Sequence, residues 1–111
     1  MHVDILGPLA VTVGGEAVEI GGARLRVLLA RLALSAGRVV TVEELSDTLW
    51  PEEKPADRAN AVQSLVSRLR RILPDASALG SAPGGYRLDI PRDSVDAHRF
   101  ERLAREGRRA L

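Results

Sequence analysis

The sequence predicts an α+β fold in which a three-helix core lies between a small N-terminal antiparallel sheet and a C-terminal β-hairpin. Three observations support this prediction. Short β-branched or aliphatic runs separated by Gly7-Pro8 and Gly14-Gly15 fill residues 1–22, as is typical of strands joined by tight turns. Segments between residues 23 and 73 carry apolar residues at helical spacing. A Pro-Gly-Gly turn then separates two short segments at residues 79–90, which indicates a hairpin.

The N-terminal sheet is expected to contain three strands. We place them at residues 3–6, 9–13 and 16–20. Gly14-Gly15 fits the turn between the second and third strands, because Gly adopts positive φ without strain.

The first helix is expected at residues 23–36, where four Leu residues recur on one face. Gly37 follows the last turn and is expected at the C′ position, where many helices end in a left-handed Gly. The predicted buried face comprises Leu25, Leu28, Leu29, Leu32 and, at its edge, Ala33.

A second, shorter helix is expected at residues 43–50, after a short bridging strand at residues 39–41. Thr41 and Glu44 have the spacing of a capping box, in which each side chain bonds the other residue's backbone N–H. Pro51 ends this helix, since a Pro ring has no N–H to continue the ladder.

The third helix, residues 57–73, has two faces of different chemistry when the chain advances by about 100° per residue. Asp57 is expected as its N-cap, and Pro74 ends it. The apolar face holds Ala59, Ala61, Val62, Leu65, Val66, Leu69, Ile72 and Leu73. The polar face holds Asn60, Gln63, Ser64, Ser67, Arg68, Arg70 and Arg71. A face without carboxylates suits contact with phosphates and base edges; an ordinary solvated basic face is the alternative interpretation.

The hairpin is expected to pair residues 79–82 with residues 86–90 across the turn at residues 83–85. A helix, a turn, a helix and a following hairpin form the layout of a winged helix, whose third helix enters the DNA major groove. A last helix at residues 96–111 carries Phe100, Leu103 and Ala104 on one face and has no later element in this chain to pack against. We therefore expect a winged-helix domain at residues 1–92 and the truncated start of a second domain at residues 93–111.

Composition narrows the possible functions of the 111 residues. Net charge is only +1, but residues 43–57 hold six acids against one Lys, and residues 58–73 hold four Arg and no acid. The absence of Cys excludes disulfides and thiolate metal sites. The only two histidines stand alone near the ends, and no nucleophile motif is present, so we predict a non-enzyme without metal or cofactor. No apolar run is long enough to span a bilayer and no signal peptide is visible, so we expect a cytoplasmic, nucleoid-associated protein without a membrane partner.

At four stretches, RLRVLLARLAL, VEELSDTLW, VSRLRRIL and GGYRL, the sequence resembles the OmpR/PhoB-type DNA-binding domain. More narrowly, it resembles the N-terminal domain of the Streptomyces antibiotic regulatory protein (AfsR) family. The tail DAHRFERLAREGRRAL is similar to the start of that family's bacterial transcriptional activation domain. The resemblance implies an activator of secondary-metabolite gene clusters that binds double-stranded DNA as two protomers on direct repeats and contacts RNA polymerase. A winged helix that binds another protein instead of DNA is the alternative.

The resemblance also implies roles for single residues. Arg68 matches the recognition-helix Arg and is expected to contact bases, and Ser81 matches a wing position that bonds a phosphate. Arg70, at the edge of the polar arc, is expected to contact phosphate or to pair with an acid of the second helix. Ala82 stands where many relatives carry Arg, which leaves Arg87 as the wing's basic residue. The remaining predicted DNA contacts are Asn60, Gln63, Ser64, Ser67 and Arg71.

The loop PEEKPA, residues 51–56, occupies the position through which OmpR-type proteins touch RNA polymerase. Glu52, Glu53 and Lys54 are the expected contacts, and a solvated linker is the alternative. Trp50 and Tyr86 are expected to be packing residues.

Overall fold

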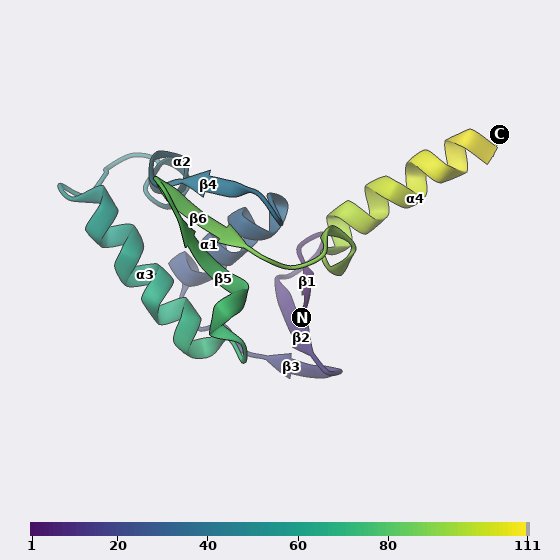
Figure 1. Ribbon diagram of the computed structural model, residues 1–111, viewed down its shortest axis with the longest axis horizontal. Coiled ribbons are helices and arrows are strands. Elements are labelled where there is room, and N and C mark those ends of the chain that lie inside the picture. The colour runs from purple at the N-terminus through teal and green to yellow at the C-terminus, as the bar shows by residue number, and fades with distance from the viewer. Residues whose placement is uncertain (111) are drawn as a thin grey trace.

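The three-helix core and both small β units are present in the structure, a computed structural model that describes the backbone of residues 1–110 and the side chains of residues 1–107. The molecule measures 52 × 28 × 25 Å. Helix α3 lies at one end of the long axis, and α4 projects from the opposite end (Figure 1). Among the described residues, none of the helices combines the length and apolar character needed to cross a membrane.

The N-terminal sheet is antiparallel and has the strand order β1-β2-β3. Its strands are β1 (His2–Asp4), β2 (Ala10–Val13) and β3 (Glu16–Val18), each shorter than predicted. Gly14 and Gly15 have φ values of 59° and 83° and form the predicted two-residue turn. Val3 and Val11 are buried, so the inner face of this sheet closes one side of the core.

Three helices form the centre of the fold. They are α1 (Ala23–Leu34), α2 (Val42–Leu49) and α3 (Arg58–Ile72). The end predicted for α1 is wrong: Ser35 is its C-cap, so Gly37 lies one position beyond C′. Gly37 still has a positive φ of 81°. Its N–H donates to the Leu88 carbonyl at 2.9 Å. Gly37 therefore bonds the C-terminal hairpin and not a carbonyl in the last turn of α1.

The predicted caps of α2 and α3 are confirmed. The Glu44 N–H donates to the Thr41 hydroxyl at 3.1 Å, and the Thr41 N–H donates to the Glu44 carboxylate at 3.2 Å. Asp57 Oδ1 accepts from the Asn60 N–H at 3.1 Å. Helix α2 ends one residue earlier than predicted, because Trp50 is its C-cap.

The second sheet contains the hairpin and one strand that the sequence did not assign to it. Its strand order is β4-β6-β5. The strands are β4 (Val39–Thr41), β5 (Leu79–Ala82) and β6 (Gly85–Leu88). The short helix η1 (Ala76–Ala78) precedes β5. The predicted turn at residues 83–85 is one residue too long, since Gly85 already pairs with Ala82 and Thr41. Gly85 passes so close to β4 that an added Cβ would lie 2.9 Å from the Val40 carbonyl carbon.

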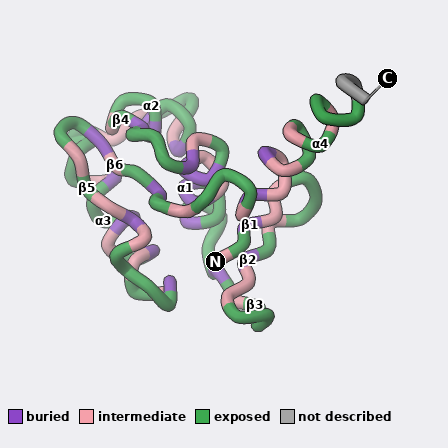
Figure 2. Tube along the Cα trace, turned by 45° about the vertical axis from the view of Figure 1, so that its right-hand side comes forward, coloured by how far each residue is buried: buried purple, intermediate pink, exposed green. Residues whose placement is uncertain are grey.

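The core lies where the helices meet the two sheets, and Figure 2 shows buried residues gathered around α1 and the strands β4 to β6. Helix α3 contributes Val62, Leu65, Val66 and Leu69, as predicted. Ala59 is exposed and Ala61 only half-buried, so the apolar face of the first turn is narrower than predicted. Trp50 and Tyr86 pack at the edge of the core.

Helix α4 (Asp96–Ala110) follows the short helix η2 (Arg92–Ser94), and its predicted last residue, Leu111, lies outside the described residues. Val95 is fully buried and forms a bridge with Val3 of β1. The Asp96 carboxylate accepts from the N–H groups of Ile5 and Leu6 at 2.7 and 3.0 Å. The start of α4 is therefore bound to the N-terminal sheet.

A second anchor joins α4 to α1. The buried His98 ring has Nε2 3.0 Å from the Ala33 carbonyl and Nδ1 3.0 Å from Arg92 Nη2. Farther along the helix, Phe100 and Leu103 are 63% and 53% exposed.

The domain boundary after residue 92 stays a prediction.

Candidate nucleic-acid interface

The polar face of α3 forms a shallow, open depression of about 420 Å³ on the surface. Its lining consists of six of the predicted DNA contacts, Asn60, Gln63, Ser64, Ser67, Arg68 and Arg71. All six come from α3, so within the described part of the chain no other element supplies a wall. The structure therefore brings these residues together on a face that is open to a large partner.

The buried apolar stripe of α3 holds the polar face outward. Val62, Val66 and Leu69 are fully buried, and this fixes the rotation of the helix about its own axis. Among the described residues, neither Arg68 nor Arg71 has an intramolecular ion pair or side-chain hydrogen bond. Both are exposed, so their guanidinium donors are available to an external acceptor.

Arg70 is separated from these six residues and faces the wing, the hairpin of β5 and β6. Its Nε donates to the Leu79 carbonyl at 2.8 Å, and its Nη2 donates to the Ser81 hydroxyl at 2.9 Å. Its guanidinium carbon lies 5.9 Å from the centre of the Tyr86 ring. The ion pair expected between Arg70 and an acid of the second helix is absent from the described residues, so that expectation is wrong. Phosphate contact by Arg70 stays a prediction.

The two other predicted wing residues lie in different environments. Ser81 is exposed, and its hydroxyl is oriented by Arg70. Arg87 lies on the opposite face of β6 from Tyr86, because successive side chains of a strand alternate. Its Nε is 2.7 Å from Asp89 Oδ1, so Arg87 would have to leave this exposed ion pair to contact DNA.

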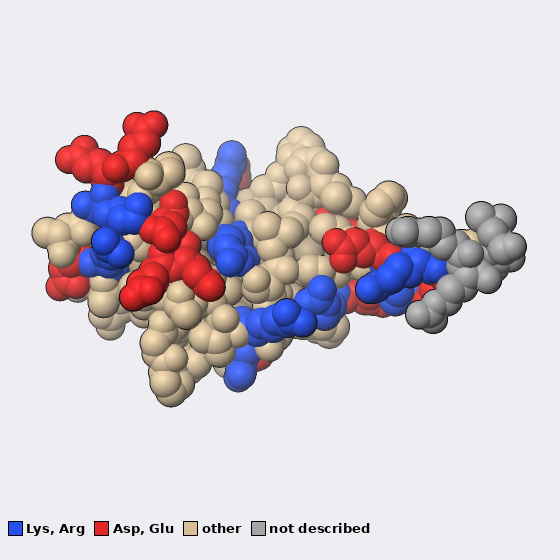
Figure 3. Space-filling model, turned by 90° about the horizontal axis from the view of Figure 1, so that it is seen from above, with Lys and Arg blue, Asp and Glu red and all other residues tan. Residues whose placement is uncertain are grey.

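The loop at residues 51–56 lies beside the end of α2. Glu52 and Glu53 are exposed, whereas Lys54 Nζ is 3.2 Å from Asp47 Oδ1. The loop borders an open hollow of about 760 Å³, which Trp50 and Arg24 also line. The Arg24 guanidinium lies 5.3 Å from the centre of the Trp50 ring, a stacking that the sequence analysis did not foresee. Seen from above, Figure 3 shows acidic side chains gathered at this end of the molecule, with basic ones between them.

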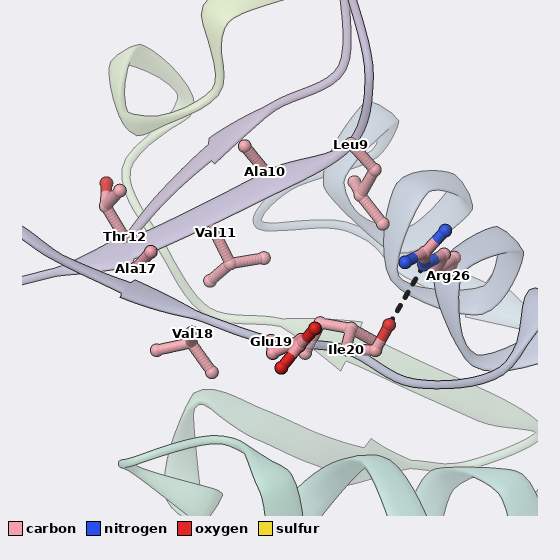
Figure 4. A pocket seen from close by; sticks show the side chains of 9 residues that line it. All are labelled: Leu9, Ala10, Val11, Thr12, Ala17, Val18, Glu19, Ile20 and Arg26. Atoms are coloured by element: carbon pink, nitrogen blue, oxygen red, sulfur yellow. Dashed lines mark hydrogen bonds between the residues drawn. The ribbon is translucent and has the colours of Figure 1, made fainter.

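A further hollow of about 400 Å³ lies against the N-terminal sheet (Figure 4). Its lining is mostly apolar, and its only charged side chains are Glu19 and Arg26. Arg26 Nε donates to the Ile20 carbonyl at 2.9 Å, which ties α1 to the chain that leaves this sheet. Across the described residues there is no group of three or more His, Cys, Asp or Glu that could hold a metal ion.

Comparison with known proteins identifies the family. The family model described as "Transcriptional regulatory protein, C terminal" matches residues 15–88, which include all three core helices and the wing. The chain belongs to this family. It is 38% identical to the regulatory protein AfsR of Streptomyces coelicolor over 99% of this chain and 11% of AfsR. It is 35% identical to the regulatory protein DnrI of Streptomyces peucetius over 99% of this chain and 44% of DnrI.

The fold is also similar to a solved structure. Mycobacterium tuberculosis EmbR, in a complex with a low-affinity phosphopeptide, has a TM-score of 0.80 and 38% identity. The match covers 89% of this chain and 27% of EmbR, so the chain spans less than half of the length of each of these relatives. The matches confirm the predicted family and winged-helix fold. The chain is a winged-helix domain of the transcriptional regulatory protein family. The contact residues stay predictions.

Proposed function

We propose that this chain binds double-stranded DNA at specific sequences by inserting α3 into the major groove. The open polar face of α3 carries this proposal. Its two Arg have no ion pair within the described residues, and its amide and hydroxyl groups stand without a carboxylate to repel phosphates. A helix is about 10–12 Å across and the B-DNA major groove is about 12 Å wide, so α3 fits the groove.

We propose a role for each side chain from its chemistry. Arg68 can donate two hydrogen bonds to guanine O6 and N7, and Asn60 or Gln63 can bond adenine N6 and N7 in the same bidentate way. Ser64 and Ser67 are short and would bond bases or sugars only at close approach. Arg71, Ser81 and Arg87 are proposed to contact the phosphate backbone, which positions the protein without reading sequence.

The wider role is proposed from the family resemblance. The protein would act in the cytoplasm on nucleoid DNA and activate transcription of a secondary-metabolite gene cluster, with two protomers side by side on direct repeats. RNA polymerase would be contacted through Glu52, Glu53 and Lys54. Two of these side chains are exposed at the edge of the hollow beside Trp50, which supports contact with a protein surface.

The test is a selection of binding sites from a random duplex library, followed by titration of the selected duplex and of a scrambled duplex at several salt concentrations. We expect a preferred sequence and a log K that falls linearly with log salt. Arg68→Ala should lose about 1–3 kcal/mol of discrimination at one base position. If the wild-type chain selects no sequence, or if the preference survives Arg68→Ala unchanged, the proposal fails.

A further inference from the structure

Arg70 differs from the other Arg residues near the end of α3 because it already has partners within the protein. Its guanidinium is half-buried and makes three contacts with the wing. Two are the hydrogen bonds to the Leu79 carbonyl and the Ser81 hydroxyl, and the third is the cation–π contact with the Tyr86 ring. A side chain that served only to neutralise a phosphate would need none of these contacts.

The three contacts join both strands of the wing to one side chain. Leu79 and Ser81 belong to β5, and Tyr86 of β6 is paired directly with Ser81. A guanidinium is planar and rigid, so two hydrogen bonds made by its Nε and Nη2 fix its orientation. The Tyr86 ring, whose centre lies 5.9 Å from the guanidinium carbon, adds a cation–π attraction. Arg70 thereby sets the position of β5 and β6 together relative to α3.

Few other contacts define that position. Leu79 and Leu88 hold the base of the wing in the core, and β4 holds its other edge through pairing with β6. In the described part of the chain, Arg70 supplies the side-chain hydrogen bonds between α3 and the wing. The spacing between the two predicted DNA-contacting elements therefore depends on Arg70 as well as on the buried base of the wing.

We propose that Arg70 is a positioning residue that holds the wing against the recognition helix instead of neutralising a phosphate. It affects site discrimination indirectly, because it fixes where the Ser81 phosphate contact places α3 on the duplex. This inference rests on the proposed function, since it concerns how the same DNA face is assembled. It assigns to Arg70 a role that differs from the phosphate contact expected from the sequence.

The deciding variant is Arg70→Lys, which keeps the positive charge but loses the rigid pair of donors and the planar stacking group. Wild type and variant are titrated against the selected and the scrambled duplex at several salt concentrations. We expect the ratio of the two affinities to fall about tenfold, a typical coupling within one hydrogen-bond network. The slope of log K against log salt should stay unchanged, because the number of neutralised phosphates is unchanged.

Three further variants serve as comparisons. Arg71→Ala removes a proposed phosphate contact from the same helix, so its salt slope should be smaller by about 0.9 while both duplexes are weakened alike. Arg26→Lys removes a similar Nε-to-carbonyl bond of 2.9 Å on α1, away from the proposed interface, and should leave discrimination as in wild type. Ser81→Ala combined with Arg70→Lys should lose no more discrimination than Arg70→Lys alone.

The outcomes separate this inference from the proposed function. If the wild-type chain shows neither a selected sequence nor a salt dependence, DNA binding itself is refuted. If wild type and Arg70→Lys distinguish the selected duplex from the scrambled one equally well, the positioning role of Arg70 is refuted. The proposal of DNA binding is then unaffected. If Arg70→Ala lowers the salt slope as much as Arg71→Ala does, Arg70 neutralises a phosphate and the inference is wrong.

Discussion

Replacing Asp96 with Ala should lower the free energy of unfolding by about 2 kcal/mol, although Asp96 lies at the start of α4 and not on the proposed interface. The carboxylate accepts hydrogen bonds from the N–H groups of Ile5, Leu6 and Ala97 at 2.7, 3.0 and 2.8 Å. Two of these donors are about 90 residues away in sequence, so the carboxylate joins α4 to the chain that follows β1.

The magnitude follows from the environment of each bond. A hydrogen bond to a charged group contributes about 1.5–3 kcal/mol. The bond from the half-buried Ile5 should contribute within this range, whereas water can replace the bond from the exposed Leu6. A loss of about 2 kcal/mol in a domain of this size corresponds to a melting temperature lower by about 8–16 °C.

The effect should depend on pH in a defined direction. Burial raises the pKa of Asp96, but the N–H donors of Ile5, Leu6 and Ala97 and the charge of Arg99 outweigh it, so the pKa lies below the usual 3.8. A carboxyl whose folded pKa is depressed stabilises the fold above its unfolded pKa, and this stabilisation is lost as pH falls through the folded value. The difference between wild type and Asp96→Ala should therefore be constant from about pH 5 to 8 and shrink below about pH 4.

Urea denaturation followed by circular dichroism measures this difference. Asp93→Ala is the matched control, because its carboxylate pairs with Arg102 at 2.9 Å with both side chains about half exposed. An exposed pair of this kind contributes little to stability, because water and salt screen it. If Asp96→Ala costs no more than Asp93→Ala, or if its effect is the same at pH 3 as at pH 7, the assigned role of Asp96 is wrong.

Three further changes should affect stability in predictable ways, each measured by urea denaturation. Gly85→Ala should cost about 1–3 kcal/mol, because its Cβ would overlap the Val40 backbone; an unchanged midpoint would show that β4 and β6 can separate freely. Thr41→Ala removes the capping box with Glu44 and should cost about 1 kcal/mol, and no loss would mean that water replaces the cap. Ser46→Ala should be neutral or stabilising by up to about 1 kcal/mol, since the fully buried hydroxyl has no partner among the described residues; a clear loss would contradict this.

Local signals predicted the helices because each helix carries its information in consecutive residues. For α3, the apolar stripe fixed its orientation, and Asp57 and Pro74 marked its limits to within a residue. Because that stripe is buried, the polar face on the opposite side of α3 had to be exposed. The strand at residues 39–41 was predicted, but its place in the wing sheet was not, since β4 pairs with residues 85–87, more than 40 positions away.

The site was less predictable where side chains cross between elements. Arg70 lies at the edge of the polar arc, and its partners were decided by where the wing closes. Arg87 was predicted as a DNA contact because of its charge. Its ion pair with Asp89 depends on the backbone path where β6 ends, which the sequence does not specify. The anchoring of α4 by His98 was missed because an isolated His carries no pattern that indicates a distant backbone acceptor.

The anchored start of α4 has a consequence for two protomers on neighbouring repeats. The contacts of Val95, Asp96 and His98 fix the direction of α4 relative to the rest of the domain. In each DNA-bound protomer, α4 would therefore point in the same direction relative to its own binding site. Repeats separated by whole turns of about 10.5 base pairs would place both helices on one side of the duplex. Inserting about half a turn, roughly 5 base pairs, would rotate one helix to the far side while leaving each single binding site intact.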